Sequence, residues 1–149
     1  MINLIGTYEC KVDAKGRMMM PVALKKQLVN ILADGFVVKR SVFNKCLELH
    51  PVTEWNVLMS EVNKLNRFVK KNNDFIRLFT AGVKMVKADG NNRLQLPKDL
   101  ILFAGIQKEI VLSSSVNMIE IWDKKQYEEV LKEASVDFTD LVEEVMGGI

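Results

Sequence analysis

Two copies of one short frame of charged residues are the part of this sequence best suited to bind an anion. Both copies have the spacing Asp-x3-Arg-x3-Pro, at Asp13, Arg17 and Pro21 and again at Asp89, Arg93 and Pro97. A guanidinium presents a planar fork of donors that can bind a guanine edge in the DNA major groove, and nearby lysines can neutralise phosphates. The candidate DNA-binding side chains are Lys11, Lys15, Arg17, Lys87 and Arg93.

The aspartate of each frame is expected to begin a tight turn between two strands. Aspartate suits the first turn position because its carboxylate accepts backbone N–H groups, and glycine suits the last because φ is positive there. The first copy predicts a three-residue hairpin loop with a glycine bulge over Asp13–Gly16. In the second copy Asn92 replaces Gly16, and asparagine is the next most tolerant residue of a left-handed backbone. We expect Asp13, Gly16, Asp89 and Asn92 to brace the two turns, each at the tip of a two-stranded ribbon.

Two interpretations of these turns stay open from the residues alone. In the first, each hairpin enters a DNA groove and its arginine contacts bases. In the second, the Asp–Arg pair is only an ion pair within the turn, which contributes little to stability when it is exposed. A protein of the second kind would be an oligomeric scaffold or a protein-interaction module without DNA binding.

The chain around the two frames is also duplicated. Residues 35–41 (GFVVKRS) match 108–114 (KEIVLSS), and residues 46–51 match 118–123, at offsets close to the 76 residues between Asp13 and Asp89. Alternating and helical apolar patterns then predict an α+β fold. The first unit is expected to contain strands at 7–12, 17–20, 36–40 and 46–50 with helices at 22–32 and from 51, and the second unit strands at 83–89, 92–97, 109–114 and 118–122 with helices at 97–105 and 124–134. The expected boundaries are 1–66 for the first repeat, 67–81 for a helical connector, 82–135 for the second repeat and 136–149 for an acidic helical tail.

Composition restricts the remaining chemistry. The chain has 149 residues, of which 48% are hydrophobic and 27% charged, as in a folded soluble domain. It has one histidine and two cysteines, and it lacks the common phosphate-binding, hydrolase and dithiol motifs, so we expect no enzyme activity, no metal and no cofactor. No apolar run is long enough to span a membrane, which favours the cytoplasm.

Charge is unevenly distributed along the chain. Residues 1–120 carry 18 Lys and Arg against 11 Asp and Glu, a net charge of +7, whereas residues 121–149 carry 3 against 8, a net charge of −5. A basic body with an acidic appendage favours a polyanionic partner.

The first frame, in the segment YECKVDAKGRMMMP, together with the second D-x3-R-x3-P and the paired segments LELHPVTEW and IEIWDKKQY, resembles the MraZ family of bacterial transcriptional regulators. The resemblance implies two tandem AbrB-like units in a pseudo-twofold, double-ψ-like barrel with peripheral helices. It implies ring-shaped homo-oligomers that bind tandem DNA repeats upstream of their own division and cell-wall operon, at the nucleoid. Asp13, Lys15, Arg17, Asp89 and Arg93 match the family motif, and the departure is Gly-Asn-Asn at residues 90–92.

Overall fold

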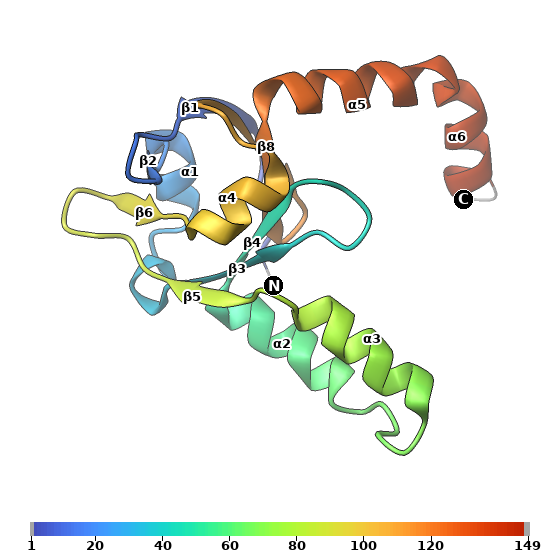
Figure 1. The fold of residues 1–149 in the computed structure, drawn as a ribbon. Helices are drawn as coiled ribbons and strands as arrows, with labels where there is room; N and C mark the ends of the chain where they lie inside the picture. The colour runs from blue at the N-terminus through green and yellow to red at the C-terminus, as the bar shows by residue number, and fades with distance from the viewer. Residues whose placement is uncertain (1, 148–149) are drawn as a thin grey trace.

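A six-stranded antiparallel sheet is the centre of the computed structural model, which describes residues 2–147. Its strands follow the order β1 (Thr7–Lys11), β7 (Glu109–Ser115), β8 (Met118–Asp123), β4 (Leu47–Pro51), β3 (Phe36–Arg40) and β5 (Lys84–Val86). A separate two-stranded ribbon is formed by β2 (Arg17–Met19) and β6 (Arg93–Gln95). The predicted α+β class is therefore confirmed (Figure 1).

The two halves of the chain exchange strands. The edge strand β1 pairs with β7 of the second half, with Tyr8 opposite Leu112, and β5 pairs with β3 of the first half. The ribbon also joins the halves, because β2 and β6 pair with Met18 opposite Leu94. Strands of each half therefore pair with strands of the other half, both in the six-stranded sheet and in the ribbon.

This exchange corrects the predicted hairpins. The segment before Asp13 was expected to pair with the segment after Gly16, but only one bridge, between Val12 and Met18, joins them. The backbone of β2 is instead bonded to β6, and that of β1 to β7. The predicted turns are present, but the two strands that flank each turn belong to different sheets.

One hydrophobic core lies between the sheet and the ribbon. Alternation along β2 and the residue after it buries Met18 and Met20 and leaves Met19 exposed, which is the period of a strand with one buried face. Leu94 and Leu96 do the same in the second half, and both halves contribute to one continuous cluster. Within residues 2–147 the backbone pairing leaves β1 and β5 as sheet edges, so the strands do not form a closed hydrogen-bonded barrel.

Two short helices follow the prolines that end β2 and β6. They are α1 (Val22–Gln27) after Pro21 and α4 (Lys98–Ala104) after Pro97, and proline favours such a position because its φ is already helical. The helix predicted at 22–32 was too long. It ends at Gln27 because Val29 and Asn30 are weak helix formers, and a 3-10 turn (Leu32–Asp34) then leads to β3.

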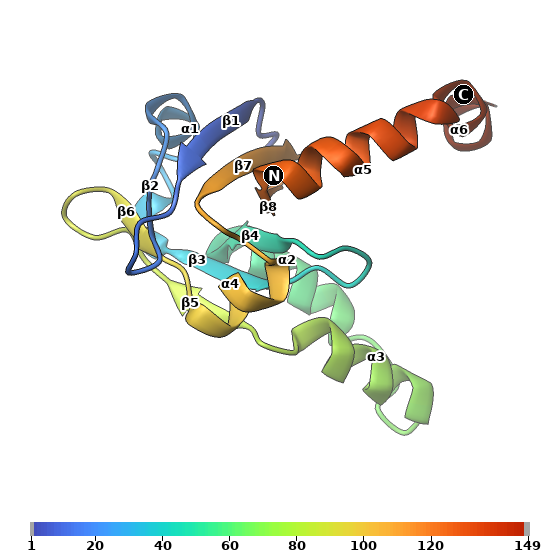
Figure 2. The same ribbon diagram turned by 45° about the horizontal axis from the view of Figure 1, so that its top comes forward.

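Four longer helices lie outside the sheet. The helices α2 (Val52–Val62) and α3 (Lys70–Thr80) form a pair, joined by stacked rings of Trp55 and Phe79 with centroids 6.1 Å apart. The helices α5 (Lys124–Val136) and α6 (Phe138–Met146) extend away from the sheet (Figures 1 and 2). No helix in the described range is long and apolar enough to cross a membrane.

Candidate nucleic-acid interface

The first turn is organised around the carboxylate of Asp13. Its Oδ1 accepts the backbone N–H groups of Lys15 and Arg17, both at 2.9 Å, and its Oδ2 accepts Nε of Arg17 at 2.8 Å. The backbone closes when the N–H of Gly16 donates to the carbonyl of Asp13 at 3.0 Å, with φ of Gly16 at 82°. One side chain thus holds both the backbone and the guanidinium.

The second turn has the same geometry. Oδ1 of Asp89 accepts the N–H groups of Asn91 and Arg93 at 2.8 and 3.0 Å, and its Oδ2 accepts Nε of Arg93 at 3.0 Å. Asn92 takes the position of Gly16 with φ of 59°, in the left-handed region. The two turns are therefore the same backbone structure built from different residues.

These bonds favour the charged form of both carboxylates. The backbone N–H of Arg17, first of all, holds the pKa of Asp13 below its usual range, and the backbone N–H of Arg93 does the same for Asp89. Each carboxylate is therefore ionised at neutral pH, and each guanidinium is fixed by a charge-assisted bond through Nε alone. Within residues 2–147, the terminal nitrogens of Arg17 and Arg93 form no hydrogen bond.

Both arginines lie on the outer face of the β2–β6 ribbon. Directly opposed residues of an antiparallel pair share one face, and Arg17 lies opposite Gln95 while Arg93 lies opposite Met19. The inner face is the buried pair of Met18 and Leu94. The arginine side chains are 29% and 28% exposed, one at each end of the ribbon, and the two turns project on the same side of the molecule (Figures 1 and 2).

The three predicted lysines lie in different surroundings. Lys15 is exposed in the first turn, where the second turn has Asn91. Lys87 follows β5 and lines a cavity of about 380 Å³ with Gln95. Lys11 is not on the ribbon: it ends β1 opposite Glu109 and lines a separate cavity of about 290 Å³.

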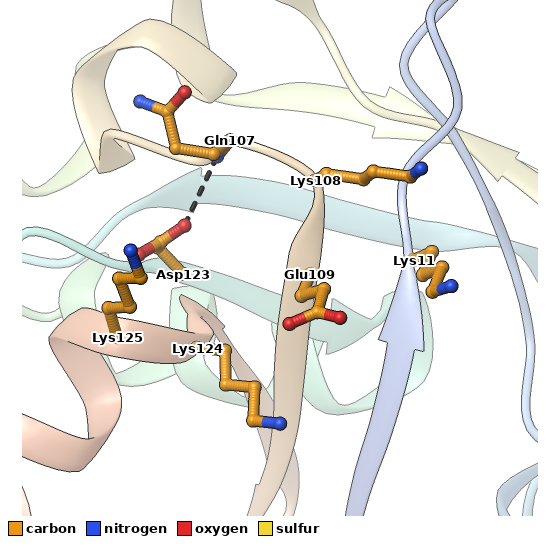
Figure 3. A pocket seen from close by; sticks show the side chains of 7 residues that line it. All are labelled: Lys11, Gln107, Lys108, Glu109, Asp123, Lys124 and Lys125. Carbon is orange, nitrogen blue, oxygen red and sulfur yellow. Dashed lines mark hydrogen bonds between the residues drawn. The ribbon is translucent and has the colours of Figure 1, made fainter.

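Lysines that sequence reasoning missed surround Lys11. Lys108, Lys124 and Lys125 line the same cavity, at the point where β7 and α5 begin (Figure 3). No local pattern indicated them, because β1 reaches β7 only through pairing between the halves. Lys124 and Lys125 begin the helix predicted at 124–134, in the part of the sequence with a net charge of −5.

The rest of the described chain offers little covalent chemistry. Burial raises the pKa of Cys10 to about 11 and that of Cys46 to about 12, so neither thiol is a thiolate nucleophile at neutral pH. Residues 2–147 contain no cluster of three His, Cys, Asp or Glu side chains able to hold a metal ion.

The sequence matches one protein family along both halves. The family described as "MraZ protein, putative antitoxin-like" matches residues 4–78 and 79–147. Among curated relatives, "Transcriptional regulator MraZ" of Christiangramia forsetii is 69% identical over 147 residues, covering 99% of this chain and 95% of the relative. A protein of the same name from Flavobacterium psychrophilum is 61% identical, covering 100% of this chain and 95% of the relative. Another, from Cytophaga hutchinsonii, is 37% identical, covering 95% of this chain and 93% of the relative.

Proposed function

The chain belongs to the MraZ family, and from this premise we propose that it is a transcriptional regulator that binds double-stranded DNA through its two Asp–Arg turns. The observation that carries the proposal is the placement of Arg17 and Arg93 on one outer face, each held through Nε with its terminal nitrogens free of partners within residues 2–147.

The free terminal nitrogens suit base recognition. A guanidinium held by a carboxylate loses little further side-chain entropy when it binds a base, because its orientation is already fixed. Two N–H donors in one plane match the O6 and N7 acceptors of guanine. Lys11, Lys15 and Lys87 contact phosphates in this proposal, which sets the register of the protein on the duplex without reading sequence.

Repeated binding sites make a weak single contact sufficient. Five basic side chains in each protomer give a modest, salt-sensitive affinity. In a ring of identical subunits, later contacts become intramolecular, and avidity adds about 10²–10⁴-fold. The proposed targets are tandem repeats upstream of the protein's own division and cell-wall operon, and the proposed location is the nucleoid in the cytoplasm. The proposed units are AbrB-like, with the sheet and the ribbon packed in a double-ψ-like arrangement that stays open at β1 and β5.

The apolar face of α6 supports an interaction-module function as the alternative. Its exposed apolar side chains are Phe138, Leu141, Val142, Val145 and Met146. A surface of this kind fits contact with protein. Such a surface could join subunits in a scaffold or in a DNA-binding ring, so a measurement of DNA affinity must distinguish the two functions.

Fluorescence anisotropy tests the proposal with the protein's own upstream DNA. We expect tighter binding to the intact sequence than to a scrambled duplex of the same length, with log K falling linearly as log salt rises. The absence of salt-dependent affinity for either duplex would leave the scaffold as the better description.

A second titration tests the ring. Duplexes with one, two and four repeats are compared at equal repeat concentration, and affinity is expected to rise steeply with repeat number. Equal affinity for one and four repeats would contradict binding by successive subunits.

A further inference from the structure

A groove lined by four lysines lies beside the first turn. Lys11 of β1, Lys108 before β7, and Lys124 and Lys125 of α5 line this cavity of about 290 Å³, which we call the lysine groove. Figure 3 shows Lys11 and Lys108 on one side of Glu109, with Lys124 and Lys125 on the other. Three elements from both halves of the chain therefore converge on one concentration of positive charge.

The groove keeps a net positive charge, because two acidic residues, Glu109 and Asp123, line it together with the four lysines. Asp123 is engaged elsewhere: its Oδ1 accepts the N–H of Gln107 at 3.1 Å and its Oδ2 accepts the N–H of Gln126 at 3.4 Å, which caps α5. Lys124 is 3.5 Å from Glu9. In the part of the chain that the structure describes, Lys11, Lys108 and Lys125 form no salt bridge.

The lysine groove is continuous with the first turn. A second cavity, of about 330 Å³, is lined by Asp13, Lys15 and Lys98, and it shares Gln107 with the lysine groove. Cationic side chains therefore extend from the turn along one surface, past Lys98 and Gln107, to α5.

The second turn lacks this feature. In the alignment of the repeats, Lys108, Lys124 and Lys125 stand opposite Gly35, Val52 and Thr53. Gly35 also lies against the Lys87 side chain, so that an added Cβ would come within 2.8 Å of it. The groove therefore lies beside only one of the two turns and is not a general consequence of the duplicated fold.

We propose that the lysine groove binds backbone phosphates of the DNA next to the site contacted by the first turn. This inference rests on the proposed function. The chemistry suits phosphate because ammonium groups bind it as point charges. The region around the first turn then contacts a longer stretch of DNA backbone than the region around the second turn, so the protein binds each site asymmetrically.

The test removes two charges from the groove. In Lys108→Gln/Lys125→Gln, two exposed ammonium groups are replaced by neutral side chains of similar length. The matched control Lys45→Gln/Lys71→Gln removes the same charge from the β3–β4 loop and from α3, on the far side of the sheet from the turns (Figure 1). Both variants are titrated with intact and scrambled upstream DNA across a salt series.

We expect the groove variant to lower the slope of log K against log salt by about 2, since each lost phosphate contact removes about 0.9. Affinity should fall by the same factor for intact and scrambled DNA, because phosphate contacts do not read sequence. The control should keep the wild-type slope.

Three outcomes would overturn the inference, and the first and third of them leave the proposed function standing. If Arg17→Ala weakens binding but the groove variant keeps the wild-type slope, the turns bind DNA and the groove does not. If the wild type shows no salt-dependent DNA affinity, both proposals fail. A titration with pyrophosphate, followed by amide NMR, tests whether the groove binds a free phosphate compound instead of DNA. If the wild type binds pyrophosphate tightly, the groove variant loses this binding, and the variant keeps the wild-type slope with DNA, the groove is a site for a free phosphate compound.

Discussion

The two Asp–Arg turns share a backbone but differ in their surroundings. In both, one carboxylate accepts two backbone N–H groups and the Nε of the arginine four residues later, at 2.8 to 3.0 Å. The first turn has Lys15 and the lysine groove beside it. The second turn has Asn91, and Gly35, Val52 and Thr53 stand where Lys108, Lys124 and Lys125 stand in the other repeat.

The comparison shows which positions the structure constrains. The turn needs aspartate first, a residue that tolerates positive φ fourth, and arginine fifth, so these three are the same or physically equivalent in both copies. The residues that would touch only DNA are free to differ. The two repeats therefore share the residues that orient the guanidinium and differ in the charged residues around it.

The largest expected effect separates the two arginines. Arg17→Ala should weaken binding to the upstream DNA by about 1–3 kcal/mol, which is the usual value of an arginine bidentate to guanine. Arg93→Ala should cost less, because fewer lysines anchor the backbone beside the second turn. Anisotropy measures both, and circular dichroism checks that folding is intact. Equal losses would show that the lysine-rich surroundings do not matter.

The fourth turn position should separate the copies in stability. At Gly16 φ is 82°, and an added Cβ would lie 3.0 Å from the carbonyl of Leu96 and 3.1 Å from Ile101. Gly16→Ala should therefore lower the free energy of unfolding by about 1–3 kcal/mol in urea denaturation. Asn92→Gly is the matched change, and it should alter stability by less than about 1 kcal/mol, since relief of strain opposes the greater unfolded-state entropy of glycine. A tolerated Gly16→Ala would mean that the first turn can relax.

Exchanging the third turn position sharpens the comparison of charge. Lys15→Asn should lower the slope of log K against log salt by about 1, and Asn91→Lys should raise it by a similar amount. The double exchange restores the wild-type slope if the two turns approach the backbone alike. A slope that stays low in the double variant would show that the second turn does not reach a phosphate.

Acid should affect the two turns equally, and this is the smallest effect. Both aspartates have a pKa below the ordinary value of 3.8 in the folded state. Their contribution to stability is complete above the unfolded pKa and is lost as pH falls through the lower, folded pKa. Thermal unfolding of Asp13→Asn and Asp89→Asn should therefore show a flatter loss of stability below pH 4 than the wild type. A change in only one variant would contradict the equivalence of the turns.

Local patterns predicted the turns well because their causes are local. The spacing of Asp13, Gly16 and Arg17 is dictated by bonds between residues at most four apart, and the same holds for Asp89, Asn92 and Arg93. The alternation of Met18 to Met20 likewise follows from one buried face.

What sequence reasoning missed depends on distant partners. The pairing of β1 with β7 has no local signal, because either strand fits several partners equally well. For that reason the hairpin predicted around Asp13 was wrong. For the same reason the sequence did not indicate that Lys108 and Lys125 lie near Lys11.

The exchange of strands between halves has a consequence during protein synthesis. Thr7 pairs with Ser113, so β1 cannot enter its sheet until more than two thirds of the chain has left the ribosome. At about 5–20 residues per second, the nascent chain waits several seconds with β1 unpaired. During this interval an unpaired strand edge is open to mispairing, and a chaperone that shields the first half while the second is translated would raise the yield of native protein.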